Sequence, residues 1–149
     1  MTTTTNHSLV QPYLFFEGRC EEALGFYRQA VGAEVTMLMR FKDNPEPPPP
    51  GSAPPNPNKV MHANFRVGNS EIMASDGRCH GKPNFQGFAL SLELATEAEA
   101  DKRFAALADG GRVELPLTKT FFSPRFGMVV DRFGVFWMVI VRAPEPPEK

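Results

Sequence analysis

The chain has 149 residues, of which 42% are apolar and 22% are charged, a composition typical of an ordinary globular domain. Sixteen lysines and arginines nearly balance seventeen acidic residues and form no cluster, which argues against a nucleic-acid partner. No apolar stretch approaches the roughly 20 residues that span a bilayer, and the first residues do not resemble a signal peptide. Two cysteines are too few for a disulfide framework, so we expect a cytoplasmic protein. The lack of an apolar spanning stretch leads us to expect no membrane partner.

The first half of the chain contains patterns for one helix and four strands. Apolar residues between Cys20 and Val31 recur every three or four positions, which predicts an amphipathic helix that ends at Gly32. Strand patterns of β-branched, aromatic and alternating residues precede and follow it. The five elements are expected at residues 12–17, 20–31, 33–41, 59–67 and 71–76.

A proline-rich segment separates the second and third of these strands. Residues 44–58 contain eight of the fifteen prolines of the chain, so they cannot form a helix or a central strand. We interpret the segment as a solvated loop between strands. The alternative is a docking motif for a domain that binds proline-rich peptides.

The second half repeats the order of the first. Its elements are expected at residues 88–94, 96–108, 112–115, 127–131 and 135–141. The helix and the glycine that follows it recur after about 78 residues, which indicates an internal repeat. We therefore expect a single domain over 1–149, with one module at about 9–76, a second at about 86–142, and flexible tails at 1–8 and 143–149.

Alternation along two of the strands separates an apolar face from a polar face. In residues 59–67 the apolar side chains Met61, Ala63, Phe65 and Val67 lie on one side, which should pack against helices. The even-numbered polar side chains then lie on the opposite face: His62, Asn64 and Arg66. Glu93 is the single acid of the strand at 88–94 and shares its face with Ala89 and Ser91. For His62 and Glu93, ordinary hydrogen bonding or ion pairing at the rim is the alternative to a functional role.

Several strings of this sequence resemble the PhnB-like family of the vicinal oxygen chelate (glyoxalase/bleomycin resistance/dioxygenase) superfamily. They are Pro12-Tyr13-Leu14-Phe15-Phe16, Glu22-Ala23 with Phe26-Tyr27, Met61-His62-Ala63, Ile72-Met73-Ala74-Ser75-Asp76, and Asp131-Arg132-Phe133-Gly134-Val135 with Trp137-Met138-Val139. The resemblance implies an α+β fold in which two βαβββ modules form curled mixed sheets around a cavity, paired in a homodimer. It does not choose an activity, because relatives include isomerases, dioxygenases, transferases and drug-sequestering proteins. Some relatives carry a label of ubiquinone methylation, but no glycine-rich loop typical of nucleotide-cofactor binding follows the first strand.

The resemblance also implies where a divalent metal would bind in the metal-dependent relatives, and this chain departs from that pattern. The usual last ligand is a glutamate, and Met138 stands at its position. The opening strand of the second half, where relatives place a histidine, has none. A divalent metal therefore has only three weak candidate ligands: His62, Glu93 and Gln11.

The leading hypothesis is a protein that binds a small-molecule ligand in the sheet cavity without the standard metal site. The candidate ligand-binding residues are His62, Asn64, Arg66, Ser75, Glu93, Arg125, Phe126 and Trp137. A loop at 118–126 adds Phe121 and Phe122, either over the pocket mouth or buried as an anchor. The alternatives are a metal-dependent lyase, isomerase or dioxygenase, and an interaction protein that uses the proline run. Covalent catalysis is disfavoured because His7 and His80 lie in tail and turn sequences.

Overall fold

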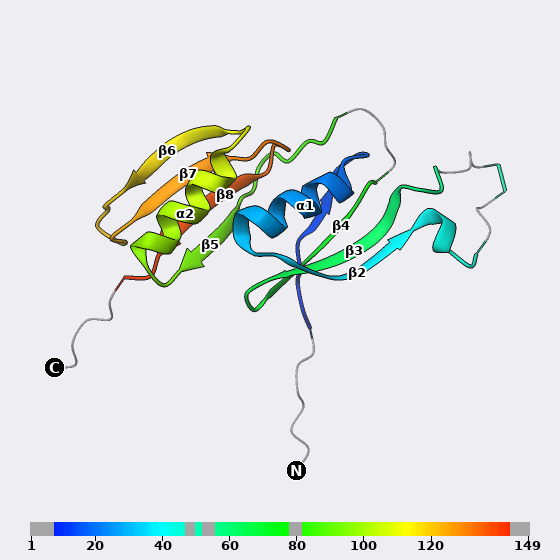
Figure 1. The fold of residues 1–149 in the computed structure, drawn as a ribbon, viewed down its shortest axis with the longest axis horizontal. Coiled ribbons are helices and arrows are strands. Elements are labelled where there is room, and N and C mark those ends of the chain that lie inside the picture. The colour runs from blue at the N-terminus through cyan, green and yellow to red at the C-terminus, as the bar shows by residue number, and fades with distance from the viewer. Residues whose placement is uncertain (1–7, 47–49, 52–55, 78–81, 144–149) are drawn as a thin grey trace, which may run out of the picture.

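The computed structural model describes residues 8–46, 50–51, 56–77 and 82–143. These residues form two α-helices and two four-stranded sheets (Figure 1). The elements of the first half are β1 (Tyr13–Phe15), α1 (Cys20–Val31), β2 (Glu34–Arg40), a 3₁₀ turn (Phe41–Asp43), β3 (Val60–Val67) and β4 (Ser70–Ser75). The second half contains β5 (Leu90–Leu94), α2 (Glu97–Ala108), β6 (Arg112–Thr118), β7 (Phe126–Val130) and β8 (Phe136–Val141). The expected pair of βαβββ units is confirmed.

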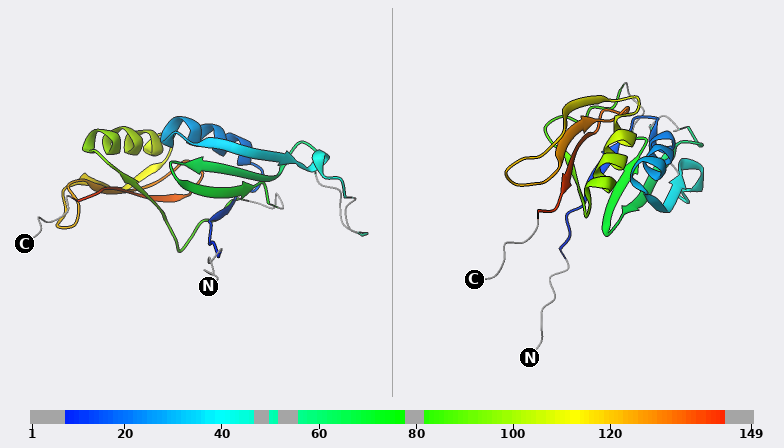
Figure 2. Two further views of the ribbon diagram at one scale, coloured as in Figure 1. Left: turned by 90° about the horizontal axis from the view of Figure 1, so that it is seen from below. Right: turned by 60° about the vertical axis from the view of Figure 1, so that its left-hand side comes forward.

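The two sheets have the same topology, as an internal repeat requires. Their strand orders are β1-β4-β3-β2 and β5-β8-β7-β6. The first and last strands of each half pair in parallel, and all other pairs are antiparallel. Helices α1 and α2 contact each other and cover the same side of the molecule, so both sheets turn their other face away from the helices (Figures 1 and 2). We call these two uncovered faces the open faces.

The end of α1 and the start of α2 lie at local signals in the sequence, a glycine and a threonine cap. The N–H of Gly32, in the left-handed region at φ 69°, donates to the Tyr27 carbonyl and ends α1. The buried Asp76 carboxylate accepts the Cys20 N–H at 2.8 Å, which satisfies a donor in the first turn of α1. The Thr96 hydroxyl accepts the Glu99 N–H and caps α2. Both helices are twelve residues long, and no helix in the described residues is long and apolar enough to cross a membrane.

A buried carboxylate links the two halves. Asp131 is 3% exposed and accepts the Tyr27 hydroxyl of α1 at 2.6 Å and the Trp137 indole N–H at 2.9 Å. Its other oxygen accepts the backbone N–H groups of Phe133 and Val135. Burial, together with the neighbouring Asp131 charge, raises the pKa of Tyr27 well above its usual value. Tyr27 therefore stays a hydrogen-bond donor across the seam between the halves.

The structure differs from the sequence-based boundaries in a few places. Strand β5 begins at Leu90, two residues later than expected. Strand β6 continues through Pro116 to Thr118, beyond the expected end at residue 115. Pro116 is tolerated because β6 is an edge strand of its sheet, where a missing N–H need not break a ladder. Residues 47–49 and 52–55 of the proline run lie outside the described residues.

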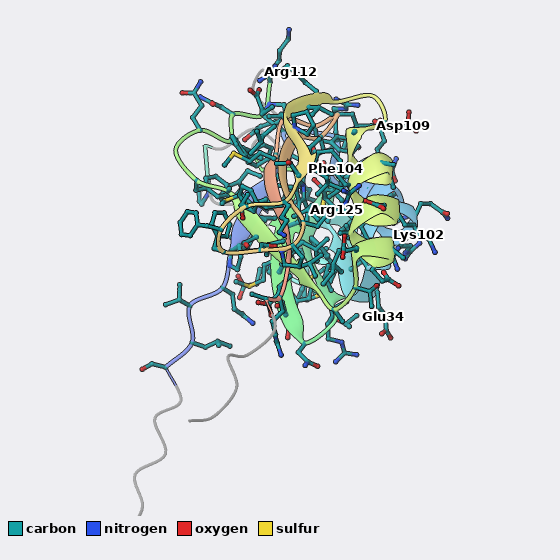
Figure 3. All side chains as sticks on the ribbon, turned by 90° about the vertical axis from the view of Figure 1, so that its left-hand side faces the viewer. Glu34, Lys102, Phe104, Asp109, Arg112 and Arg125 are labelled. Atoms are coloured by element: carbon teal, nitrogen blue, oxygen red, sulfur yellow. The ribbon has the colours of Figure 1, made fainter. Side chains whose placement is uncertain are left out.

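Helix α2 packs closely on the second sheet through Phe104. Phe104 is 8% exposed and points from α2 toward the sheet, whereas Lys102 and Asp109 lie on the solvent side (Figure 3). Gly127 of β7 faces Phe104, and a Cβ at this position would lie 2.8 Å from the Phe104 ring. The absence of a side chain on Gly127 thus allows the close approach of helix and sheet.

Candidate functional site

The open face of the first sheet carries polar side chains on adjacent strands. Ala63 and Phe65 of β3 are fully buried on the helix side, as the alternation predicted. His62 and Asn64, which alternate with them along the strand, are half-buried on the open face. Register places Tyr13 of β1 beside Met73 of β4, and Met73 beside Asn64. These side chains therefore form one row across three strands.

Three hydrogen bonds connect the polar side chains of this face. The Tyr13 hydroxyl lies 2.9 Å from Nδ1 of His62, and Nε2 of His62 lies 2.6 Å from Oδ1 of Asn64. Nδ2 of Asn64 donates to Glu71 at 2.9 Å. Both ring nitrogens of His62 thus have partners within the protein. We call Tyr13, His62, Asn64 and Glu71 the polar chain.

The open face of the second sheet is mainly apolar. Its half-buried side chains are Met128, Val130, Phe136, Met138 and Ile140. Ser91 and Glu93 of β5 lie beside them, because Ser91 pairs with Met138 and Glu93 with Ile140. Both side chains are exposed. A cavity of about 670 Å³ lies on this face, under the segment 83–89. The two open faces therefore differ in chemistry: hydrogen-bonding side chains cross the first, whereas the second is mainly apolar.

Some predicted site residues engage charged partners at the surface. Arg66 lies 3.4 Å from Glu34, and Glu93 pairs with Arg142 at 2.8 Å. The ion pair at the rim that was the alternative role of Glu93 is thus present, with Arg142 as the partner. Arg125 pairs with a helix residue, Asp101 of α2, at 2.7 Å. The structure thus does not gather these side chains around His62.

Other predicted site residues are buried. Ser75 is 3% exposed, and its hydroxyl accepts the Gly77 N–H in a local turn. Phe126 is 5% exposed and contacts the Phe122 ring, with centroids 5.0 Å apart. Trp137 is 2% exposed and alternates with Phe136 and Met138, so its indole faces the helices and bonds to Asp131. Phe121 is fully exposed beside Phe122.

A smaller cavity adjoins the polar chain. It has a volume of about 330 Å³ and is lined by Tyr13, Phe15, Glu17, Lys82, Asn84, Phe85 and Phe88. The Tyr13 and Phe15 rings stack with centroids 4.8 Å apart. Phe15 is 51% exposed and Phe88 is 44% exposed, so two ring faces remain open to solvent or ligand. We call this the aromatic pocket.

The donor set does not fit the metal site of the metal-dependent relatives. His62 uses both ring nitrogens in the polar chain, and Glu93 is paired with Arg142. Gln11 and Glu93 line a different groove, of about 950 Å³, to which His62 does not contribute. Among the described residues, no group of three or more His, Cys, Asp or Glu side chains has an arrangement that could hold a metal ion. Met138 faces the open side with a thioether where those relatives carry a carboxylate.

The described part of the chain offers one cysteine as a potential nucleophile, and its surroundings make it a poor one. Cys20 is a free, fully buried thiol at the start of α1. Burial, followed by the charges of Asp76 and Glu21, raises the pKa of Cys20 to about 12. The thiol therefore stays protonated at neutral pH and unreactive.

Two helices side by side over two four-stranded sheets of identical topology define the glyoxalase/bleomycin-resistance class of the vicinal oxygen chelate superfamily. The FosX fosfomycin resistance protein of Listeria monocytogenes shares this fold at 11% identity and a TM-score of 0.65, over 93% of this chain and 96% of that one.

Within that class, the chain belongs to the family described as 3-demethylubiquinone-9 3-methyltransferase, whose sequence model matches residues 8–140. Protein YjdN of Escherichia coli K12 is 35% identical over 93% of this chain and 99% of its own length. Protein PA1353 of Pseudomonas aeruginosa is 40% identical, with a TM-score of 0.76 over 91% and 98% of the two chains. The PhnB protein of Bacillus cereus is 29% identical, with a TM-score of 0.74 over 90% and 99%. The PhnB-like resemblance is confirmed.

Sequence reasoning selected His62 and Asn64 but missed their two outer partners. Tyr13 was treated as part of a strand pattern and Glu71 as the start of one. Strand alternation places Tyr13 with Phe15 and Glu71 with Met73 on single faces, but it does not say which faces meet. The pairing of β1 and β3 with β4 decides that.

Proposed function

We propose that this protein is a homodimer that binds a small organic molecule between two unlike open faces. The first sheet of one copy, with the polar chain, faces the second sheet of the other, with its apolar surface. The observation that carries this proposal is the difference between the faces: hydrogen-bonding groups on one, and Met128, Val130, Phe136, Met138 and Ile140 on the other. A pocket with apolar walls and few directed polar groups is typical of small-molecule sites.

Twofold pairing would use the same contact twice and would cover both apolar faces at once. A half-buried apolar sheet face is otherwise costly in water, since apolar surface gains about 25 cal/mol for each Å² buried. The ligand would be held by His62 and Asn64, with Arg66, Glu93 and Arg125 as candidate contacts at the rim and Ser75, Phe126 and Trp137 as supports from behind. The near-zero net charge supports a protein without a nucleic-acid partner, and the small number of cysteines supports a cytoplasmic location.

We propose binding without the metal of the metal-dependent relatives, because the available side chains do not make its ligand set. The test is native mass spectrometry of untagged protein purified without chelator, which measures subunit number and metal content together. We expect a dimer with metal far below one per chain. Near-stoichiometric metal that is lost in His62→Ala would instead favour the alternative, a metal-dependent lyase, isomerase or dioxygenase.

A matched pair of variants tests the dimer itself. Ile140→Glu places a charge on the apolar open face, and Lys102→Glu changes charge on the exposed side of α2. We expect Ile140→Glu to be monomeric with a retained circular dichroism spectrum, and Lys102→Glu to stay dimeric. A wild-type protein that is monomeric at every concentration would contradict the proposal.

A further inference from the structure

The polar chain has a fixed direction that its atoms determine. An ionised carboxylate only accepts hydrogen bonds, so Glu71 requires the amide nitrogen of Asn64 to point toward it. The amide oxygen of Asn64 then faces His62 and can only accept, which requires the hydrogen of the neutral imidazole on Nε2. Nδ1 is left with its lone pair, and Tyr13 must donate its hydroxyl hydrogen to it.

Glu71 therefore sets the tautomer of His62 at a distance of two hydrogen bonds. Every donor in the chain points the same way, from Tyr13 to Glu71. A phenol that has given its one hydrogen to a neighbour keeps lone pairs that accept from a third group. Tyr13 is thus the accepting end of the chain, and it lines the aromatic pocket.

The aromatic pocket suits a planar ligand. Tyr13, Phe15, Phe85 and Phe88 supply ring surfaces, and the Phe85 and Phe88 rings meet edge to face with centroids 6.4 Å apart. Lys82 supplies one positive charge at its wall. The volume of the aromatic pocket, about 330 Å³, is at the small end of the range for ligand pockets, which is about 300 to 1,000 Å³.

We propose that this pocket binds a planar molecule with a weakly acidic hydroxyl, of the phenol or enol class, and ionises it through Tyr13. The ligand O–H bond breaks and its proton goes to the Tyr13 oxygen, while the Tyr13 hydroxyl proton goes to Nδ1 of His62. The products are the ligand anion and the His62 imidazolium, so charge and protons balance without a co-reactant. This inference rests on the proposed small-molecule function of the open face.

The surrounding charges decide whether this transfer is favoured. The negative charge of Glu71, which is joined to His62 by hydrogen bonds through Asn64, stabilises the imidazolium. The positive charge of Lys82 attracts the ligand anion. Glu17 also lines the pocket and opposes the anion. On β3, Arg66 is offset by Glu34, and the side chain of β2 that faces His62 is the uncharged Met39. The transfer requires the free lone pair on Nδ1 of His62.

The experiment uses 4-nitrophenol, whose anion absorbs visible light and whose neutral form does not. The probe is titrated into the wild-type protein at a fixed, neutral pH. We expect visible absorbance to rise as the probe binds. Tyr13→Phe keeps the ring but removes the relay oxygen, and His62→Gln removes the proton acceptor; we expect each to abolish the rise and to weaken binding about tenfold, which is 1.4 kcal/mol. Lys102→Gln, on the outer side of α2, should match the wild type.

Glu71→Gln tests the positioning residue separately. Glutamine can donate as well as accept, so Asn64 is free to turn over and the tautomer of His62 is no longer fixed. Long-range ¹H–¹⁵N spectra should show the hydrogen on Nε2 of His62 in the wild type and a mixture in Glu71→Gln, with less than half of the absorbance rise.

The outcomes separate this inference from the proposed function. Binding of 4-nitrophenol without an absorbance rise, or a rise that persists in Tyr13→Phe, overturns the relay and leaves the binding function intact. A dimer that binds no 4-nitrophenol overturns the aromatic pocket as a phenol site. A monomeric wild-type protein contradicts the proposed function itself, whichever way the probe responds.

Discussion

Replacing Asp131 by asparagine tests the buried link between the two halves. The carboxylate accepts four hydrogen bonds, two from backbone N–H groups and two from Tyr27 and Trp137. The asparagine amide nitrogen is best placed toward Tyr27, whose hydroxyl can rotate and accept from it, so the Trp137 N–H is the donor left without an acceptor. An unsatisfied buried donor costs about 1–3 kcal/mol, and bonds to a charged acceptor are about 1 kcal/mol stronger than neutral ones. We therefore expect Asp131→Asn to lower the free energy of unfolding by about 2–4 kcal/mol.

The assay is urea unfolding at fixed protein concentration, because a dimer's apparent stability depends on concentration. Circular dichroism follows the whole fold, and Trp137, the single tryptophan, reports by fluorescence from within the network. Tyr27→Phe removes one of the four bonds and should cost about 1.5–3 kcal/mol. The two changes should be non-additive by at least about 0.5 kcal/mol because they share a bond.

A loss below about 1 kcal/mol for Asp131→Asn would refute this reasoning. It would mean that the four hydrogen bonds barely exceed the cost of burying the carboxylate, so that removal of the charge compensates for the lost bonds. Additivity with Tyr27→Phe would mean that the bond between the halves contributes nothing of its own.

Three further predictions concern stability and are checked by urea unfolding. Because burial raises the pKa of Cys20 from 9.0 to about 12, the unfolded thiol ionises first as pH rises; stability is full below pH 9.0 and falls from there toward about 12. The free energy of unfolding should fall by about 1 kcal/mol between about pH 8 and pH 9.5 because of the thiol. Cys20→Ala, compared with its own value at about pH 8, should not show this fall. An equal alkaline fall in both proteins would contradict the assignment to Cys20. Gly127→Ala places a Cβ against Phe104 and should lower the free energy of unfolding by about 1–3 kcal/mol. Gly25→Ala, in a helix with no atom within 4 Å of the new Cβ, should raise it by about 0.5–1 kcal/mol. Effects of the same sign would refute the packing argument. Thr96→Ala removes the cap of α2 and should cost about 1 kcal/mol, with Thr96→Ser as the control that keeps it.

Most helices and strands could be predicted from the sequence because apolar period and terminal glycines act between residues that are close together in the chain. The helix at Cys20–Val31 was placed at its observed ends by its apolar period and by Gly32. The end of β6 was misplaced because Pro116 breaks a central strand but not an edge strand, and position in the sheet is not a local property. The two faces of β3 were assigned correctly for Ala63 and Phe65 by alternation alone.

By itself, the sequence determined the order of the elements, the internal repeat, the family and the split of β3 into apolar and polar faces, because period, turn residues and motif strings are written along the chain. Only the tertiary structure decided the partners. The pairing of β1 and β3 with β4 brought Tyr13 and Glu71 to His62 and Asn64 from positions far apart in sequence. The same folding turned Trp137 toward Asp131 and gave Glu93 to Arg142. Hydrogen bonds depend on distance in space, and alternation along one strand cannot supply the register between strands.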